Sequence, residues 1–229
     1  MTITPTGLTR AAAVAAVAAG TVFIAVQVRH PHLDATTIQT TEMAVRGTAK
    51  VVMAVLALVG ISGMYLSQVR RNGVLGLVGY LVFSVGYLLT MGTAYVAAFV
   101  MPHVAALAPG YADDVIAATT NGSPTGDIGA MATVAHLQGF AWLGGGVLFG
   151  IALFRAGVLA RWASVLLAVG GLVTAALSVM PDAFYRLLAF PNSIAMIGLG
   201  ISLWRSQRDA SSRETIAARE PATGVAAVR

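Results

Sequence analysis

Long apolar runs separated by short polar segments make up most of the chain. A helix rises about 1.5 Å per residue, so about 20 apolar residues cross the roughly 30 Å hydrocarbon core of a bilayer. The runs near this length contain no Asp, Glu or Lys, and their only arginine is Arg186, near the start of the last run. The pattern predicts an all-α polytopic membrane bundle of six transmembrane helices, at residues 11–28, 51–69, 74–101, 130–154, 162–180 and 184–204.

Two of the polar connections between these runs are long. In the first, Glu42, Arg46 and Lys50 recur at every fourth residue, which predicts an ion-paired row on a helix that leads into the second span. The connection at residues 101–129 is the longest in the chain. It is rich in Gly, Pro, Asn, Ser and Thr, and a short surface helix is predicted over Tyr111–Thr119.

Aromatic and polar residues follow one side of the third span. Their spacings of four, three, four and four residues keep them on one helical stripe, which consists of Tyr80, Ser84, Tyr87, Met91 and Tyr95. In lipid such a stripe faces other helices, so a helix–helix seam is the favoured interpretation. The alternative is a ligand cavity lined by the stripe, with Tyr87 and Tyr95 as candidate ligand contacts.

Pro191 lies about a third of the way along the last predicted span and is followed by Asn192. A proline frees a carbonyl in the preceding turn of a helix, and broken membrane helices can present such backbone groups to a substrate. A simple kink is the favoured interpretation, because prolines are frequent in ordinary membrane helices. Asn192 is a candidate ligand contact under the alternative.

Composition agrees with a membrane protein. Hydrophobic residues make up 57% of the chain and charged residues 10%, against about 25% charged in soluble domains, and the mean hydropathy is +0.80. The chain has no cysteine, which excludes disulfides, thiolate metal sites, iron–sulfur clusters and a cysteine nucleophile. The pI near 10.1 comes mainly from arginines that flank the apolar runs, so it indicates membrane topology and no nucleic-acid partner.

The arginines are distributed unevenly between the two sides of the predicted bundle. One side holds Arg10, Arg70, Arg71, Arg155, Arg161, Arg205, Arg208, Arg213, Arg219 and Arg229. By the positive-inside rule this side is cytoplasmic, which predicts a multi-pass protein of the cytoplasmic membrane with both termini inside. Residues 1–205 then form one transmembrane domain. Residues 206–229 lack apolar periodicity and are predicted to be a disordered cytoplasmic tail.

This topology places all four histidines and six of the nine acidic residues on the outer side: His30, His32, His103, His136, Asp34, Glu42, Asp113, Asp114, Asp127 and Asp182. Imidazole and carboxylate are the ligands that a divalent ion such as zinc takes when no thiolate is present. The candidate metal ligands are His30, His103, His136 and Asp127. Solvated loop residues are the favoured interpretation, since outer loops must be polar.

His136 is the only histidine inside an apolar span. An unpaired imidazole there is costly, so the sequence predicts a partner for it among His103, Asp127, Asp34 and Glu42. His136 and His103 are therefore also candidate ligand-binding residues. A b-type haem needs histidines that face each other from two helices at matched depth, which this chain does not offer, and no cofactor is predicted.

The stretch Phe149–Leu172, FGIALFRAGVLARWASVLLAVGGL, resembles a broad group of bacterial six-helix integral membrane proteins known only as a domain of unknown function. The resemblance implies the six-helix architecture. It implies no catalytic residue, because no activity is assigned to the group.

These observations favour a non-enzymatic membrane protein. We expect it to bind a small apolar or amphipathic molecule, or a partner membrane protein, within the helix bundle in the lipid bilayer. The first alternative is a membrane enzyme or metal-dependent protein that uses the outer His and Asp residues. A small-solute transporter is a further alternative, although ion-coupled transporters usually carry acidic residues deep in their helices and this chain has none there.

Overall fold

The computed structural model describes residues 4–120, 122–176 and 189–217, and within these ranges it is helical and contains no β-strand. The elements are α1 (Pro5–Gln27), the short 3₁₀ helix η1 (Thr37–Gln39), α2 (Thr41–Leu66), α3 (Val69–Phe99), α4 (Met101–Leu107), α5 (Pro109–Thr119), α6 (Met131–Ala156), α7 (Arg161–Ala176) and α9 (Ala189–Ala217). The prediction of an all-α protein is confirmed.

Among the residues that the structure describes, four helices, α1, α2, α3 and α6, are long and apolar enough to cross a membrane. They cover the first four predicted spans and support the assignment to membrane proteins. The last two predicted spans, 162–180 and 184–204, fall partly on residues 177–188, which lie outside the described ranges. Their described parts are helical, in α7 and α9, and the count of six spans stays a prediction.

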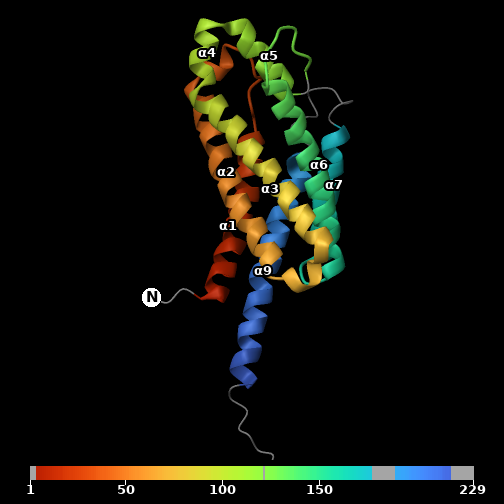
Figure 1. Ribbon diagram of the computed structural model, residues 1–229. Coiled ribbons are helices and arrows are strands. Elements are labelled where there is room, and N and C mark those ends of the chain that lie inside the picture. Colours follow the sequence, from red (N-terminus) through yellow and green to blue (C-terminus); the bar gives the residue numbers. More distant parts are fainter. Residues whose placement is uncertain (1–3, 121, 177–188, 218–229) are drawn as a thin grey trace, which may run out of the picture.

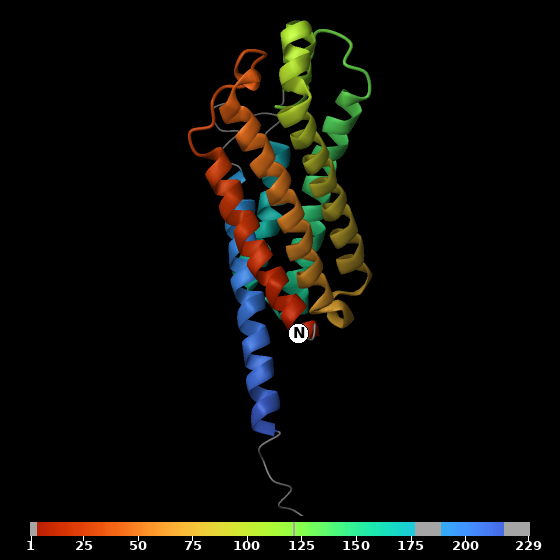
Figure 2. The same cartoon turned by 90° about the vertical axis from the view of Figure 1, so that its left-hand side faces the viewer.

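The long helices form a closed ring. Going round it, α1 contacts α2, α2 contacts α3, α3 contacts α6, α6 contacts α7, α7 contacts α9, and α9 returns to α1. Their axes run along one common direction, as both views of the bundle show (Figures 1 and 2). Helices that are distant in sequence, such as α1 and α9, are therefore direct neighbours.

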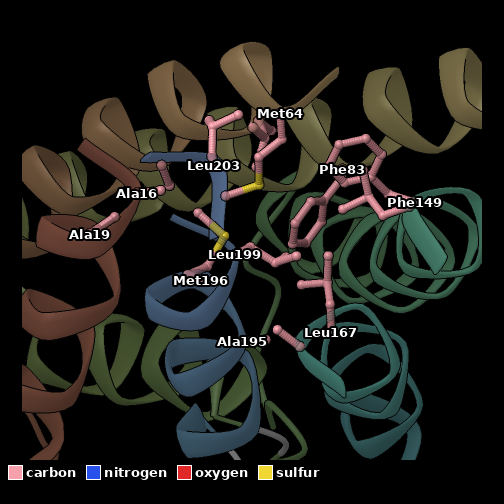
Figure 3. Packing of buried hydrophobic residues seen from close by; sticks show 14 of the residues in the cluster. Ala16, Ala19, Met64, Phe83, Phe149, Leu167, Ala195, Met196, Leu199 and Leu203 are labelled. Atoms are coloured by element: carbon pink, nitrogen blue, oxygen red, sulfur yellow. The ribbon is translucent and has the colours of Figure 1, made fainter. Parts of the chain in front are cut away.

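Large apolar side chains fill the middle of this ring (Figure 3). Those that are at most 1% exposed include Met53, Ile61, Phe83, Tyr87, Phe149, Leu167, Met196 and Leu199. In lipid, helices associate through close packing because there is no water to expel, and small residues make that packing possible. A Cβ added to Gly79 would meet the backbone of Phe149, and one added to Gly146 would meet that of Gly171.

A second apolar cluster caps one end of the ring. It joins η1, α4, α5 and the segment before α6, and its buried members are Ala35, Ile38, Met101, Ala105, Ala112, Val115, Ile116 and Ile128. The predicted surface helix over Tyr111–Thr119 is confirmed as part of α5. We call this end the capped end; Figure 1 shows it opposite the end at which α1 begins.

The other end, here called the arginine end, carries the start of α1, the α2–α3 turn, the α6–α7 turn and the point where α9 leaves the bundle (Figure 1). The basic segment before the third span turns at Gly73, whose φ of +56° suits glycine and breaks the helical geometry inside α3. Regular helix therefore resumes at Val74, where the third span was predicted to start.

The last helix, α9, is described from Ala189, directly after residues 177–188, which lie outside the described ranges. Pro191 is near the start of this described part, and the kink predicted there stays a prediction. The helix continues to Ala217, whereas disorder was predicted from residue 206. Extending an existing helix avoids the cost of nucleation, so even a polar segment can continue it. Residues 218–229 lie outside the described ranges.

Candidate functional site

The two histidines predicted to take part in ligand binding lie at the surface. His136 is exposed on α6 and His103 is exposed on α4. Neither makes a side-chain hydrogen bond or ion pair to any residue that the structure describes. No partner for His136 is therefore found among the residues that the structure describes.

The predicted metal ligands are not brought together within the described ranges. No group of three or more His, Cys, Asp or Glu side chains that could hold a metal ion is found in them. His30 is buried, with Nδ1 2.9 Å from the carbonyl oxygen of Pro31 and Nε2 3.3 Å from Nζ of Lys50. Asp127 is exposed and accepts a hydrogen bond from the backbone N–H of Gly129 at 2.8 Å. Asp182 lies outside the described ranges.

The aspartates of the capped end hold backbone turns. Asp113 accepts a hydrogen bond from the N–H of Ala35 at 2.6 Å and so joins the two long connections. Asp114 accepts from the N–H groups of Thr125 and Gly126 at 2.7 and 3.0 Å. Asp34 accepts from two N–H groups at the start of η1. These carboxylates therefore hold the loop backbone in place, at positions where metal binding or enzyme chemistry was considered.

Acid is expected to loosen the capped end. Hydrogen bonds from Thr37 and Thr125 lower the pKa values of Asp34 and Asp114 below their usual range. A lowered folded-state pKa adds stability above the unfolded value, about 4, which is lost as the pH falls through the folded value. Limited proteolysis should therefore cut residues 122–130 faster at pH 3 than at pH 6. An Asp114→Asn variant should be cut readily at both pH values. Equal resistance of the wild type to cleavage at pH 3 and pH 6 would contradict the expected loosening.

Two predicted ligand residues, Tyr87 and Asn192, do meet in the centre of the ring. Tyr87 is 1% and Asn192 3% exposed, and the Asn192 amide donates a hydrogen bond of 3.3 Å to the Tyr87 hydroxyl, linking α9 to α3. The Tyr87 ring lies 4.9 Å from the ring centroids of both Phe83 and Trp142. The pair is enclosed by packed rings, which agrees with the helix–helix seam favoured for this stripe.

The stripe on α3 does not stay on one face of the bundle. Tyr80 packs inside, where its hydroxyl is 2.9 Å from that of Ser62, but Tyr95 is 54% exposed and packs beside Phe99. Steps of about 100° per residue rotate Tyr95 roughly 60° away from Tyr80. Tyr95 therefore lies outside the group that the structure brings together.

A polar seam between α3 and α6 was not singled out by the sequence. The indole N–H of Trp142 donates to Thr90 at 2.9 Å, and the hydroxyl of Thr93 donates to the side-chain oxygen of Gln138 at 3.1 Å. The threonines lie nearly one turn apart on α3, a spacing that could have indicated this seam. Because these side chains form hydrogen bonds with one another, the seam joins the two helices and offers no open binding site.

An open apolar groove lies between α1 and α2, near the capped end. Its volume is about 440 Å³ and it is lined by Val22, Ala44, Val45, Thr48, Ala49 and Val52. The hydroxyl of Thr48 donates to the carbonyl of Ala44 at 2.8 Å, so the lining offers hydrocarbon and no free donor. None of the predicted ligand residues lines it. Val and Ala are common throughout the apolar runs, and no sequence signal marks this groove.

A charged pair stands at the capped end of this groove. Glu42 precedes Val45 and Ala49 by three and seven residues, which places it on the same face of α2. Its carboxylate forms an ion pair of 2.8 Å with Arg46, and the two side chains are 54% and 17% exposed. The Arg46 guanidinium also donates to three carbonyl groups at the end of α1. The predicted ion-paired row is thus present from Glu42 to Arg46.

Comparison with protein-family models, with curated proteins and with solved structures finds no match to this chain.

Proposed function

We propose that the chain is an integral membrane protein that crosses the cytoplasmic membrane six times, with both termini inside, and binds an amphipathic molecule of the bilayer without transforming it. The groove between α1 and α2 carries this proposal. Val45 and Val52 in its lining are 62% and 50% exposed, so it opens sideways, where the hydrocarbon of a bilayer would lie. Its volume falls within the roughly 300–1,000 Å³ of small-molecule sites.

The chemistry of the groove selects the type of ligand. An apolar lining without free donors suits an alkyl chain, which needs no hydrogen bonds. The Glu42–Arg46 ion pair above it suits a polar or zwitterionic head, so the ligand is an amphiphile with its chain along α2. The alternative of a membrane enzyme or metal-dependent protein has no such support, because the described residues do not bring the imidazoles and carboxylates together.

A photoreactive phospholipid with a diazirine in its acyl chain tests the proposal. We expect mass spectrometry to find the label concentrated on peptides of α1 and α2. Val52→Phe places a ring in the groove and should reduce this labelling several-fold. The matched control is Val85→Phe on α3, whose valine is 48% exposed, against 50% for Val52, and does not line the groove. Equal labelling of all lipid-facing helices, or equal effects of both variants, would refute a ligand site there.

A further inference from the structure

Two tryptophans lie where α7 and α9 reach the arginine end of the bundle. Trp162 is in the first turn of α7 and 58% exposed. Trp204 is 38% exposed on α9, beside Arg10 near the start of α1. The two helices are direct neighbours, and the Trp162 ring packs over Gly198 of α9, where a Cβ would collide with it. The rings therefore border one corner of the bundle.

The indole N–H groups at this corner have no acceptor among the residues that the structure describes. Trp142 differs, because its N–H donates to Thr90 inside the bundle. Buried or interfacial indoles usually find a hydrogen-bond partner, and Trp is enriched at membrane interfaces, where one side of the ring is apolar and its N–H can reach lipid polar groups. Trp162 and Trp204 thus offer two donors at the edge of the apolar region.

Each tryptophan is next to an exposed arginine in the sequence. Arg161 precedes Trp162 and Arg205 follows Trp204, and neither arginine forms an ion pair with a carboxylate among the side chains that the structure describes, which in α9 end at Arg208. Arg161 lies 5.4 Å from the ring centroid of Phe154, and Arg10 of α1 lies 5.8 Å from that of Trp204. The corner therefore combines the positive charge of exposed arginines with exposed aromatic surface.

Apolar stripes extend from both tryptophans towards the capped end. On α7 the exposed residues at helical spacing after Trp162 are Val165, Val169 and Leu172, and on α9 those before Trp204 are Ile201 and Ile194. Hydrocarbon chains can lie along such stripes while the head of the same molecule stays at the level of the arginines. The pattern fits an amphiphile with an anionic head.

We infer that this corner binds an anionic phospholipid of the adjoining leaflet. The guanidinium groups of Arg161 and Arg205 hold the phosphate, the indole N–H groups donate to phosphate or ester oxygens, and the acyl chains follow the stripes on α7 and α9. This inference needs the membrane location but not the groove between α1 and α2, which lies on other helices near the capped end.

Tryptophan quenching by brominated lipids tests the inference directly. The full chain is reconstituted in phosphatidylcholine vesicles that contain a set fraction of either brominated phosphatidylglycerol or brominated phosphatidylcholine. We expect the phosphatidylglycerol to quench more strongly at equal fraction, with an apparent affinity about fivefold higher for each arginine engaged. An equal response to the two lipids in the wild type would overturn the inference.

Charge-matched double variants distinguish a specific lipid-binding site from diffuse electrostatic attraction to anionic lipid. Arg161→Gln with Arg205→Gln should abolish the preference for phosphatidylglycerol. Arg70→Gln with Arg71→Gln removes the same charge at the same end, away from both tryptophans, and should keep the preference. Equal losses in the two double variants would show diffuse charge attraction and refute a site. Competition by millimolar inorganic phosphate would show a free-anion site in its place, and circular dichroism melting verifies that all variants fold.

Discussion

Gly145→Val is expected to destabilise the bundle by about 3 kcal/mol, the upper part of the usual range for overpacked cores. A Cβ at position 145 would overlap the backbone atoms of Phe83 on α3, and a backbone cannot swing aside as a flexible side chain can. Phe83 is itself fully buried against Phe149 and Trp142. Moving α3 away from α6 would therefore open the centre of the ring.

Thermal unfolding of the purified protein in detergent measures this loss. Gly139→Val is the matched control: it lies on the same helix, changes helix propensity in the same way, and an added Cβ there meets nothing within 4 Å. The control should melt close to the wild type. If both variants lost stability equally, the cause would be the β-branched residue in the helix and not the contact between α3 and α6.

Hydrophobicity along the chain predicted where membrane helices run, because the thickness of the bilayer demands a minimum apolar length. It did not predict where helices begin. The second span was placed from residue 51, whereas α2 starts at Thr41, where the Thr40 hydroxyl accepts from the N–H of Met43. The spacing of Glu42 and Arg46 indicated that earlier helix, since ion pairs form between residues four apart. Hydropathy marks the part in lipid, and caps and charge spacing mark the helix.

The candidate site was harder to predict, for a reason visible on α6. His136 and Gln138 are about 200° apart on the helix, so they face opposite directions, as their spacing requires. Spacing cannot tell which of them faces the bundle. In the structure the side-chain oxygen of Gln138 accepts a hydrogen bond from the Thr93 hydroxyl on α3, whereas His136 is exposed. The groove was missed for another reason: its Val and Ala residues match the lipid-facing surface in composition, and only the arrangement of α1 and α2 makes them a groove.

Arg46→Met is expected to cost about 2 kcal/mol of stability and to loosen the junction between α1 and α2. The last carbonyl groups of a helix have no partner within it. In this protein the Arg46 guanidinium supplies the missing donors. It donates hydrogen bonds to the carbonyl groups of Val26, Val28 and Arg29 at 2.9, 3.2 and 3.2 Å. Methionine keeps much of the side-chain length and removes every one of these donors.

Two control variants assign the loss to those carbonyl groups. Glu42→Gln removes the only carboxylate paired with Arg46 in the described part of the chain, but this side chain is 54% exposed, so the loss should stay below about 1 kcal/mol. Arg46→Lys keeps the charge as a single point that cannot span three carbonyls, and should recover only part of the stability. Thermal melts and hydrogen exchange at residues 24–30 measure both effects. Full recovery by lysine would mean that charge alone, and not the fork of donors, holds the end of α1.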